Sequence, residues 1–153
     1  MNQFKRLEQF LDDLFVSKTP ALSANIKEAT AKVLPWAVIV LSGVGLVAWF
    51  SSVGLLFTYF GWTSGYAVSS PSVSLMYVAF YLLLAPIIQG LGLYGGYRML
   101  SRQRKGWTVV YYSLLIGLIP QMTSFSIVGL LLNVAFLYLM FQIKSQYAVG
   151  MTE

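Results

Sequence analysis

The sequence predicts an all-α fold: a transmembrane four-helix bundle with both termini cytoplasmic, preceded by an N-terminal amphipathic helix. The first observation behind it is composition. The 153-residue chain is 58% hydrophobic and 10% charged, whereas soluble domains carry roughly 25% charged residues. The second is that residues 33–97 and 106–143 contain no charge, and each stretch is long enough for two spans of about 20 residues. The third is that Lys and Arg flank these stretches.

The chain begins with a pattern typical of an amphipathic helix, over residues 3–17 of a cytoplasmic or interfacial segment, 1–34. At about 100° per residue its apolar side chains share one face: Phe4, Leu7, Phe10, Leu11, Leu14 and Phe15. Such a helix lies in the inner membrane interface with its Phe rings below the headgroups, or it packs against protein, this chain's own or a partner's. The sequence leaves both interpretations open.

Two proline signals follow this segment. Thr19-Pro20 indicates a helix start, with Thr19 as N-cap and Pro20 at the first helical position. Residues 21–34 are therefore predicted to be helical. Pro35 is predicted to kink the chain where it enters the bilayer.

The transmembrane domain is predicted over residues 35–147, with a short tail at 148–153. Its four spans are expected at about 36–60, 72–97, 107–120 and 127–143. Pro86 interrupts the second span and Pro120 lies at the end of the third. Both prolines are expected to kink their helices, because proline cannot donate the interior hydrogen bond.

Orientation follows from the basic residues alone. All ten Lys and Arg residues lie in the N-terminal segment, in the turn between the second and third spans, or after the fourth span. Cytoplasmic loops carry the excess of Lys and Arg, so the pattern predicts four spans, both termini inside the cell and contact with membrane lipids. The basic turn consists of Arg98, Arg102, Arg104 and Lys105. Because these residues flank apolar spans, no nucleic-acid partner is expected.

The second span carries a small-xxx-small pattern, with Gly92 and Gly96 four residues apart and Gly90 nearby. Glycines on one helix face let two backbones approach closely, which is the main source of attraction between helices in lipid. The pattern is typical of a seam in a homo-oligomer and also of packing within one four-helix bundle. We favour packing within the bundle, with the homo-oligomer seam as the alternative.

Two amide side chains, Gln89 and Asn133, lie within predicted spans. They are expected to face the bundle interior and to pair with one another, since an interhelical bond of this kind contributes about 0.6–2 kcal/mol. Gln89 lies one turn after Pro86, and its amide can satisfy the carbonyl that the proline leaves free. The alternative is a polar lining for a small ligand.

Several chemistries are not expected, because the residues that they require are missing from the predicted spans. No ionisable Asp, Glu, Lys, Arg or His lies in a span, and such residues mark ion and proton pathways. The chain contains neither Cys nor His, the commonest ligands of zinc and haem centres. No catalytic residue, cofactor or metal site is predicted, so the protein is not expected to be an enzyme.

Short motifs along the whole chain resemble a family of small bacterial four-helix integral membrane proteins. They are Pro20-Ala21-Leu22, Ile26-Lys27-Glu28, Leu34-Pro35-Trp36, Arg104-Lys105-Gly106-Trp107, Tyr111-Tyr112-Ser113 and Phe141-Gln142-Ile143-Lys144-Ser145-Gln146-Tyr147. The resemblance implies a location in the bacterial cytoplasmic membrane. It carries over no activity and assigns no functional residues.

The lack of catalytic, metal-binding and ion-pathway residues, together with the amphipathic helix, favours a non-enzymatic accessory, assembly or scaffolding protein that acts through helix–helix contacts. A protein partner or a homo-oligomer is then expected. The alternative is an oligomeric transport or binding module for a neutral or lipidic small molecule. Polar residues around a shared cavity near Gln89 and Asn133 favour this alternative, whereas a dry, closed bundle favours the first.

Overall fold

The computed structural model describes residues 3–63, 75–123 and 127–147, with side chains for 6–54, 82–119, 121–122 and 127–147. These residues form helices and no strand, so the prediction of an all-α fold is confirmed. The α-helices are α1 (Gln3–Asp12), α2 (Ala24–Thr63), α3 (Leu75–Leu100), α4 (Arg104–Thr123) and α5 (Ile127–Gln142). A π-helical turn, η1 (Asp13–Ser17), follows α1, and a 3₁₀ turn, η2 (Lys144–Gln146), follows α5.

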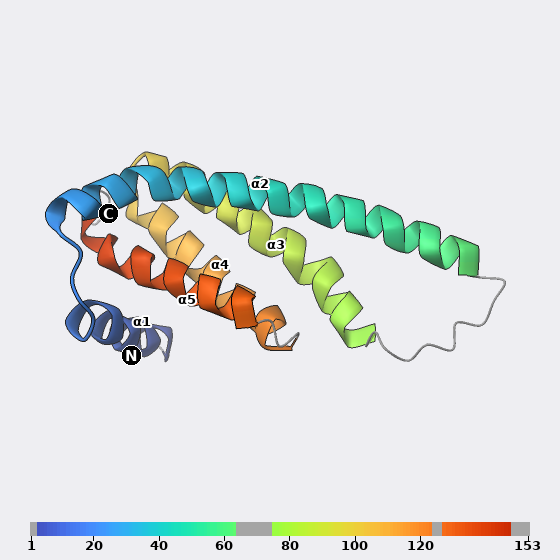
Figure 1. Cartoon of the computed structure of the whole chain (residues 1–153), viewed down its shortest axis with the longest axis horizontal. Coiled ribbons are helices and arrows are strands. Elements are labelled where there is room, and N and C mark those ends of the chain that lie inside the picture. Colours follow the sequence, from blue (N-terminus) through green and yellow to red (C-terminus); the bar gives the residue numbers. More distant parts are fainter. Residues whose placement is uncertain (1–2, 64–74, 124–126, 148–153) are drawn as a thin grey trace.

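Helices α2 to α5 run alternately in opposite directions along the molecule (Figure 1). Helix α2 packs on α3, α3 on α4, and α4 on α5. Helix α1, the start of α2, the α3–α4 turn and the end of α5 gather at one end of the molecule. We call it the basic end, because these elements carry the Lys and Arg residues of the described chain.

The start of α2 differs from the prediction. The helix begins at Ala24 rather than after Thr19-Pro20, and the Ser23 carbonyl accepts its first hydrogen bond, from the Lys27 N–H at 2.9 Å. The Thr19 hydroxyl instead donates to the Phe15 carbonyl at 2.6 Å. Thr19 therefore closes the preceding turn and is not available as an N-cap, so that prediction is wrong.

Pro35 lies inside α2, which continues unbroken from the predicted cytoplasmic segment into the predicted first span. Proline has no N–H, so the carbonyl four residues earlier loses its usual donor. That carbonyl belongs to Ala31, and the Tyr147 hydroxyl donates to it at 3.0 Å. Ala31, Pro35 and Tyr147 are all buried. The chain end after α5 thus satisfies the backbone group that the proline leaves free.

The other predicted kink prolines also lie within helices. Pro86 is inside α3. Helix α4 extends to Thr123, beyond the end expected at residue 120, and the Pro120 side chain lies outside the described residues. Helix α4 also starts three residues before the expected span, at Arg104. Two residues of the basic turn, Arg104 and Lys105, are therefore helical.

The α3–α4 turn is a tight one. The Arg102 N–H donates to the Met99 carbonyl at 2.9 Å and the Gln103 N–H to the Arg98 carbonyl at 3.3 Å. This pattern is a Schellman motif, whose left-handed residue is usually glycine. Here that residue is Arg102, with φ of 56°.

The predicted amphipathic helix docks on α5 through its last turn. Residues 13–17 form η1 instead of continuing α1, and this turn places the Phe15 ring 5.9 Å from that of Phe141 and 6.2 Å from that of Tyr138. The Gln142 amide donates to the Phe15 carbonyl at 2.7 Å and accepts from the Leu22 N–H at 3.3 Å. One buried α5 side chain thus holds both ends of the α1–α2 connection.

Only part of the predicted apolar face is used in this docking. Leu11 packs against the core beside the buried Phe15. Leu7, Phe10 and Leu14 stay exposed, with Phe10 at 61%. The Phe4 side chain lies outside the described residues. Of the two interpretations, docking on protein therefore holds for one edge of the helix, while its other edge remains uncovered.

Helix α2 is the described segment that is long and apolar enough to cross a membrane. The most apolar 18-residue window within Ala24–Gly54 has a mean hydropathy of 2.1, and 22% of that window is buried. The exposed side chains include Val40, Val44 and Val47. Helix α5 is a shorter apolar helix of the same kind.

Candidate functional site

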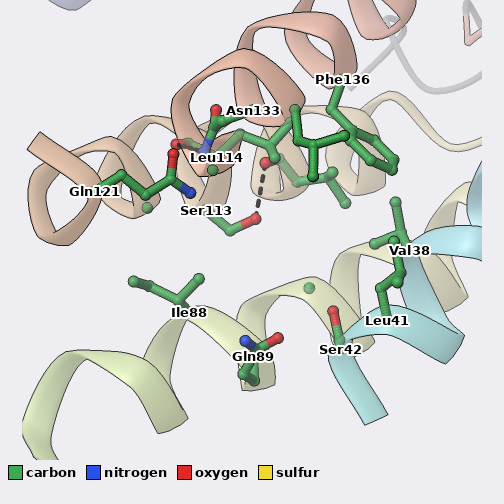
Figure 2. A pocket seen from close by; sticks show the side chains of 15 residues that line it. Val38, Leu41, Ser42, Ile88, Gln89, Ser113, Leu114, Gln121, Asn133 and Phe136 are labelled. Carbon is green, nitrogen blue, oxygen red and sulfur yellow. Dashed lines mark hydrogen bonds between the residues drawn. The ribbon is translucent and has the colours of Figure 1, made fainter. Parts of the chain in front are cut away.

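A cavity of about 290 Å³ lies among helices α2 to α5. Figure 2 shows one wall formed by α2 and α3 and the opposite wall formed by α4 and α5. Each of the helices α2 to α5 contributes at least one polar side chain to the lining: Ser42, Gln89, Ser113, Gln121 and Asn133. The remaining lining residues are apolar or glycine, and none of the described lining residues is charged. The cavity therefore offers uncharged hydrogen-bonding groups inside an apolar wall.

Asn133 is the most constrained of these polar groups. Its side chain is 6% exposed, and its amide nitrogen donates to the Leu114 carbonyl of α4 at 3.2 Å. Its amide oxygen is buried and has no hydrogen-bond partner among the described residues. A buried polar atom left without a partner costs about 1–3 kcal/mol.

Gln89 lies on the opposite wall (Figure 2) and rests against a glycine of α2. A Cβ at position 45 would lie 2.5 Å from the amide nitrogen of Gln89, so a larger residue there would push the Gln89 side chain aside. The predicted bond between Gln89 and Asn133 is not formed, because Asn133 bonds to the α4 backbone instead. Both amides nevertheless line the same cavity.

A second, apolar groove lies between α2 and α5. It has a volume of about 410 Å³, and Val33, Ala37 and Leu139 are among its lining residues. Phe136 lines both the groove and the cavity, so its side chain borders the two spaces.

The predicted glycine seam contacts α2 of the same chain. A Cβ at Gly96 would lie 3.3 Å from the Pro35 carbonyl oxygen, and one at Gly92 would meet Ser42. Gly90, by contrast, faces open space, with no atom within 4 Å of its Cβ position. Gly92 and Gly96 thus bring α3 and α2 together within one chain, and only Gly90 is left outside this contact.

At the basic end, next to the cavity, aromatic side chains of α4 and α5 form a closely packed cluster. Trp107 is fully buried, and its indole N–H donates to the Met140 carbonyl at 2.7 Å. Its ring stacks on Tyr111 at 5.4 Å between centroids and meets the edge of Phe141 at 5.5 Å. Such pairs contribute about 0.5–1.5 kcal/mol beyond burial. This cluster anchors α4 to α5.

Charged side chains cover the aromatic cluster. The guanidinium of Arg104 lies 4.1 Å from the Trp107 ring centroid and 3.1 Å from the Glu8 carboxylate of α1. Glu8 also pairs with Lys144 at 3.1 Å, and Asp12 pairs with Lys144 at 3.2 Å. Burial lowers the pKa of Arg104, while the charges of Glu8 and Asp12 raise it.

The first turn of α4 has no acidic residue of its own, although a helix N-terminus favours negative charge. The Glu8 carboxylate of α1 pairs with the Arg104 side chain of that turn. The charged network therefore joins α1 to α4 and to the chain after α5.

The remaining residues of the predicted basic turn have different surroundings. Arg98 donates to the Gln103 side-chain oxygen at 2.8 Å. The Arg102 guanidinium lies 5.7 Å from the Tyr147 ring centroid. Burial raises the pKa of Tyr147 to about 12, and the positive charge of Arg102 partly opposes that rise. Lys105 is exposed.

Sequence reasoning missed three residues that organise these sites: Ser42, Gln142 and Tyr147. A signal existed for the last two, since both belong to the motif Phe141–Tyr147 that follows the fourth span. Their partners are backbone groups more than 100 positions away. No pattern along the chain indicates which distant carbonyl a side chain will reach.

Comparison of the chain with protein-family models, with curated proteins and with solved structures finds no match. The resemblance to small bacterial membrane proteins therefore stays a prediction.

Proposed function

We propose that this chain is a four-span integral membrane protein, with both termini in the cytoplasm, that binds a neutral amphiphile in its central cavity. The observation that carries the proposal is the uncharged polar lining contributed by all four helices α2 to α5. A binding or transport module was the alternative to a scaffold on sequence grounds, and a shared polar cavity was the feature that favours it.

The membrane part of the proposal is supported by the side chains that face outward. A soluble core helix is mostly buried, whereas the apolar window of α2 is only 22% buried. Soluble monomers rarely expose large contiguous apolar surfaces. The gathering of basic residues at one end supports the orientation, because cytoplasmic loops carry the excess of Lys and Arg.

The nature of the ligand follows from the lining. A charged group would face no counter-charge at the described cavity residues, and burying an unpaired charge is costly. The uncharged side chains of Ser42, Gln89 and Asn133 line the cavity, so a ligand with a hydroxyl or amide group meets hydrogen-bonding groups there. The groove between α2 and α5 accommodates an apolar tail. A neutral lipid with a hydrogen-bonding head satisfies all three conditions.

The binding test compares two serines of α2. Ser42 is buried at the cavity, whereas Ser51 is exposed and its hydroxyl bonds to the Val47 carbonyl of its own helix. Protein purified in nanodiscs from native lipid extract is analysed by native mass spectrometry for retained neutral lipid. Asn133→Leu and Ser42→Ala are expected to reduce retention, and Ser51→Ala to leave it unchanged. Equal retention in all variants would exclude ligand binding in this cavity.

The topology test uses single cysteines, because the chain has none of its own. Ser69→Cys lies between the first two predicted spans and Ser101→Cys in the α3–α4 turn. A membrane-impermeant thiol reagent on intact cells is expected to label Cys at 69, and to reach 101 only after lysis. The reverse pattern contradicts the proposed orientation.

A scaffolding function is the second candidate, supported by the uncovered edge of α1. Leu7, Phe10 and Leu14 are exposed although α1 is docked. The change Phe10→Asp is expected to abolish recovery of a co-purifying protein while leaving lipid retention in the cavity unchanged. Co-purification that survives this change removes the support for a scaffold acting through α1.

A further inference from the structure

A second cavity, of about 350 Å³, lies at the basic end between η1, the start of α2, the start of α4 and η2. Three cationic side chains from three different elements line it: Lys27, Arg104 and Lys144. Asp12 is the acidic residue among its lining side chains. The cavity is thus distinct from the uncharged one among α2 to α5, and its lining has the opposite character.

We propose that this basic cavity binds the phosphate group of an anionic membrane lipid. Phosphate oxygens accept several charge-assisted hydrogen bonds at once, and Arg and Lys are the side chains that usually donate them. The inference assumes a membrane protein but does not depend on the ligand of the central cavity.

The charges around the cavity leave one cation without a partner. Glu8 bridges Arg104 and Lys144, and Asp12 pairs with Lys144. Lys27 forms no ion pair within the described residues. Three positive charges therefore face two negative ones, and one phosphate monoanion or diester balances the sum.

Two of the three cations, Arg104 and Lys144, are held in place before any anion arrives. The side chains of Arg104 and Lys144 are 19% and 23% exposed, and both lie over the Trp107 ring. Partial burial strengthens the attraction to an anion, because the surroundings screen charge less than water does. The remaining wall includes Val16, which is 39% exposed and offers an apolar surface to the part of a lipid next to its phosphate.

The position of the cavity suits a lipid headgroup. It lies where α4 begins and α5 ends, at the boundary between the charge-free stretch 106–143 and the basic residues on either side of it. Headgroups of a bilayer occupy this level when the apolar stretch spans the hydrocarbon. Anionic lipids attract basic side chains there by about 1 kcal/mol per charge.

The test compares two lysines of α2 that differ in surroundings. Lys27 lines the cavity, whereas Lys32 is exposed and pairs with Glu28 at 2.8 Å. The full chain is placed in nanodiscs of phosphatidylcholine with a minor fraction of phosphatidylglycerol, and bound phosphatidylglycerol is quantified by native mass spectrometry. Lys27→Gln is expected to weaken its retention about fivefold, and Lys32→Gln to leave it unchanged.

Two results overturn the proposal. Equal losses for Lys27→Gln and Lys32→Gln would mean that diffuse positive charge attracts the lipid and that the cavity is no site. The second arm adds inorganic phosphate to protein in nanodiscs of phosphatidylcholine alone. Binding of phosphate there, lost in Lys27→Gln, assigns the cavity to a soluble anion and overturns the lipid. Because nanodiscs offer the same lipids on both faces, neither result depends on the orientation of the chain.

Discussion

Helices α4 and α5 change character along their length. At the basic end they enclose the buried rings of Trp107, Tyr111 and Phe141, and the polar atom of the Trp107 ring is hydrogen-bonded. Asn133, about two turns from Phe141 along α5, lines a cavity between the helices. The Asn133 oxygen and the Tyr111 hydroxyl of the ring cluster both lack a partner among the described residues, so the two regions differ in packing. Closely packed interiors resist changes in volume. The ring cluster thus holds the helices together at one end, while the middle leaves a cavity.

The largest expected effect separates two tryptophans. Trp107→Ala removes a fully buried ring, and such truncations cost about 3–5 kcal/mol. Trp36 is 59% exposed, so Trp36→Ala is expected to cost less than about 1 kcal/mol. Thermal unfolding in detergent, followed by circular dichroism, measures both. Equal destabilisation would mean that the aromatic cluster does not anchor the fold.

The second prediction compares two glycines of α4 and sharpens the contrast between the two regions. A Cβ at Gly106 would lie 2.6 Å from the Met99 backbone nitrogen, whereas one at Gly117 would lie 3.4 Å from the Asn133 amide. Gly106→Ala is expected to destabilise by about 1–3 kcal/mol. Gly117→Ala is expected to stabilise the helix by about 0.5–1 kcal/mol. Chemical unfolding in mixed micelles measures the change in unfolding free energy for each variant. A loss of stability in both would contradict looser packing around the cavity.

The third prediction concerns the carbonyl that Pro35 leaves free. Tyr147→Phe removes its donor and is expected to cost about 1–2 kcal/mol, because the Ala31 oxygen stays buried. Pro35→Ala restores a backbone N–H at position 35, which can donate to the Ala31 carbonyl. In the Pro35→Ala background, Tyr147→Phe is therefore expected to cost much less stability. A double-mutant cycle of unfolding free energies measures the coupling. Additive effects would show that the two residues act independently.

The smallest expected effect is electrostatic. Glu8→Gln removes the bridge between Arg104 and Lys144, and a partly buried network of this kind contributes about 1 kcal/mol. The matched control is Glu28→Gln, since Glu28 is exposed and pairs only with Lys32 on the surface, and no measurable change is expected there. Limited proteolysis within residues 18–23 reports release of α1. High salt is expected to mimic Glu8→Gln in the parent chain, because screening weakens ion pairs.

The sequence alone determined the helical class, the apolar stretches that form α2 to α5, and the position of the basic residues on either side of those stretches. These features depend on local composition, because a long uncharged apolar stretch favours helices of the length that a membrane span requires. The amphipathic helix was also visible from its periodicity, and the inward position of Gln89 and Asn133 was expected from the cost of exposing amides to lipid.

Only the tertiary structure decided where those elements meet. The Thr19-Pro20 signal is a standard helix start, yet Thr19 bonds backward to the Phe15 carbonyl, which also accepts a hydrogen bond from Gln142 of α5. Asn133 bonds to Leu114 rather than to Gln89, since the two amides lie on opposite walls. Tyr147 reaches Ala31 across the whole chain. Local patterns report which groups need a partner, but packing between distant helices selects it.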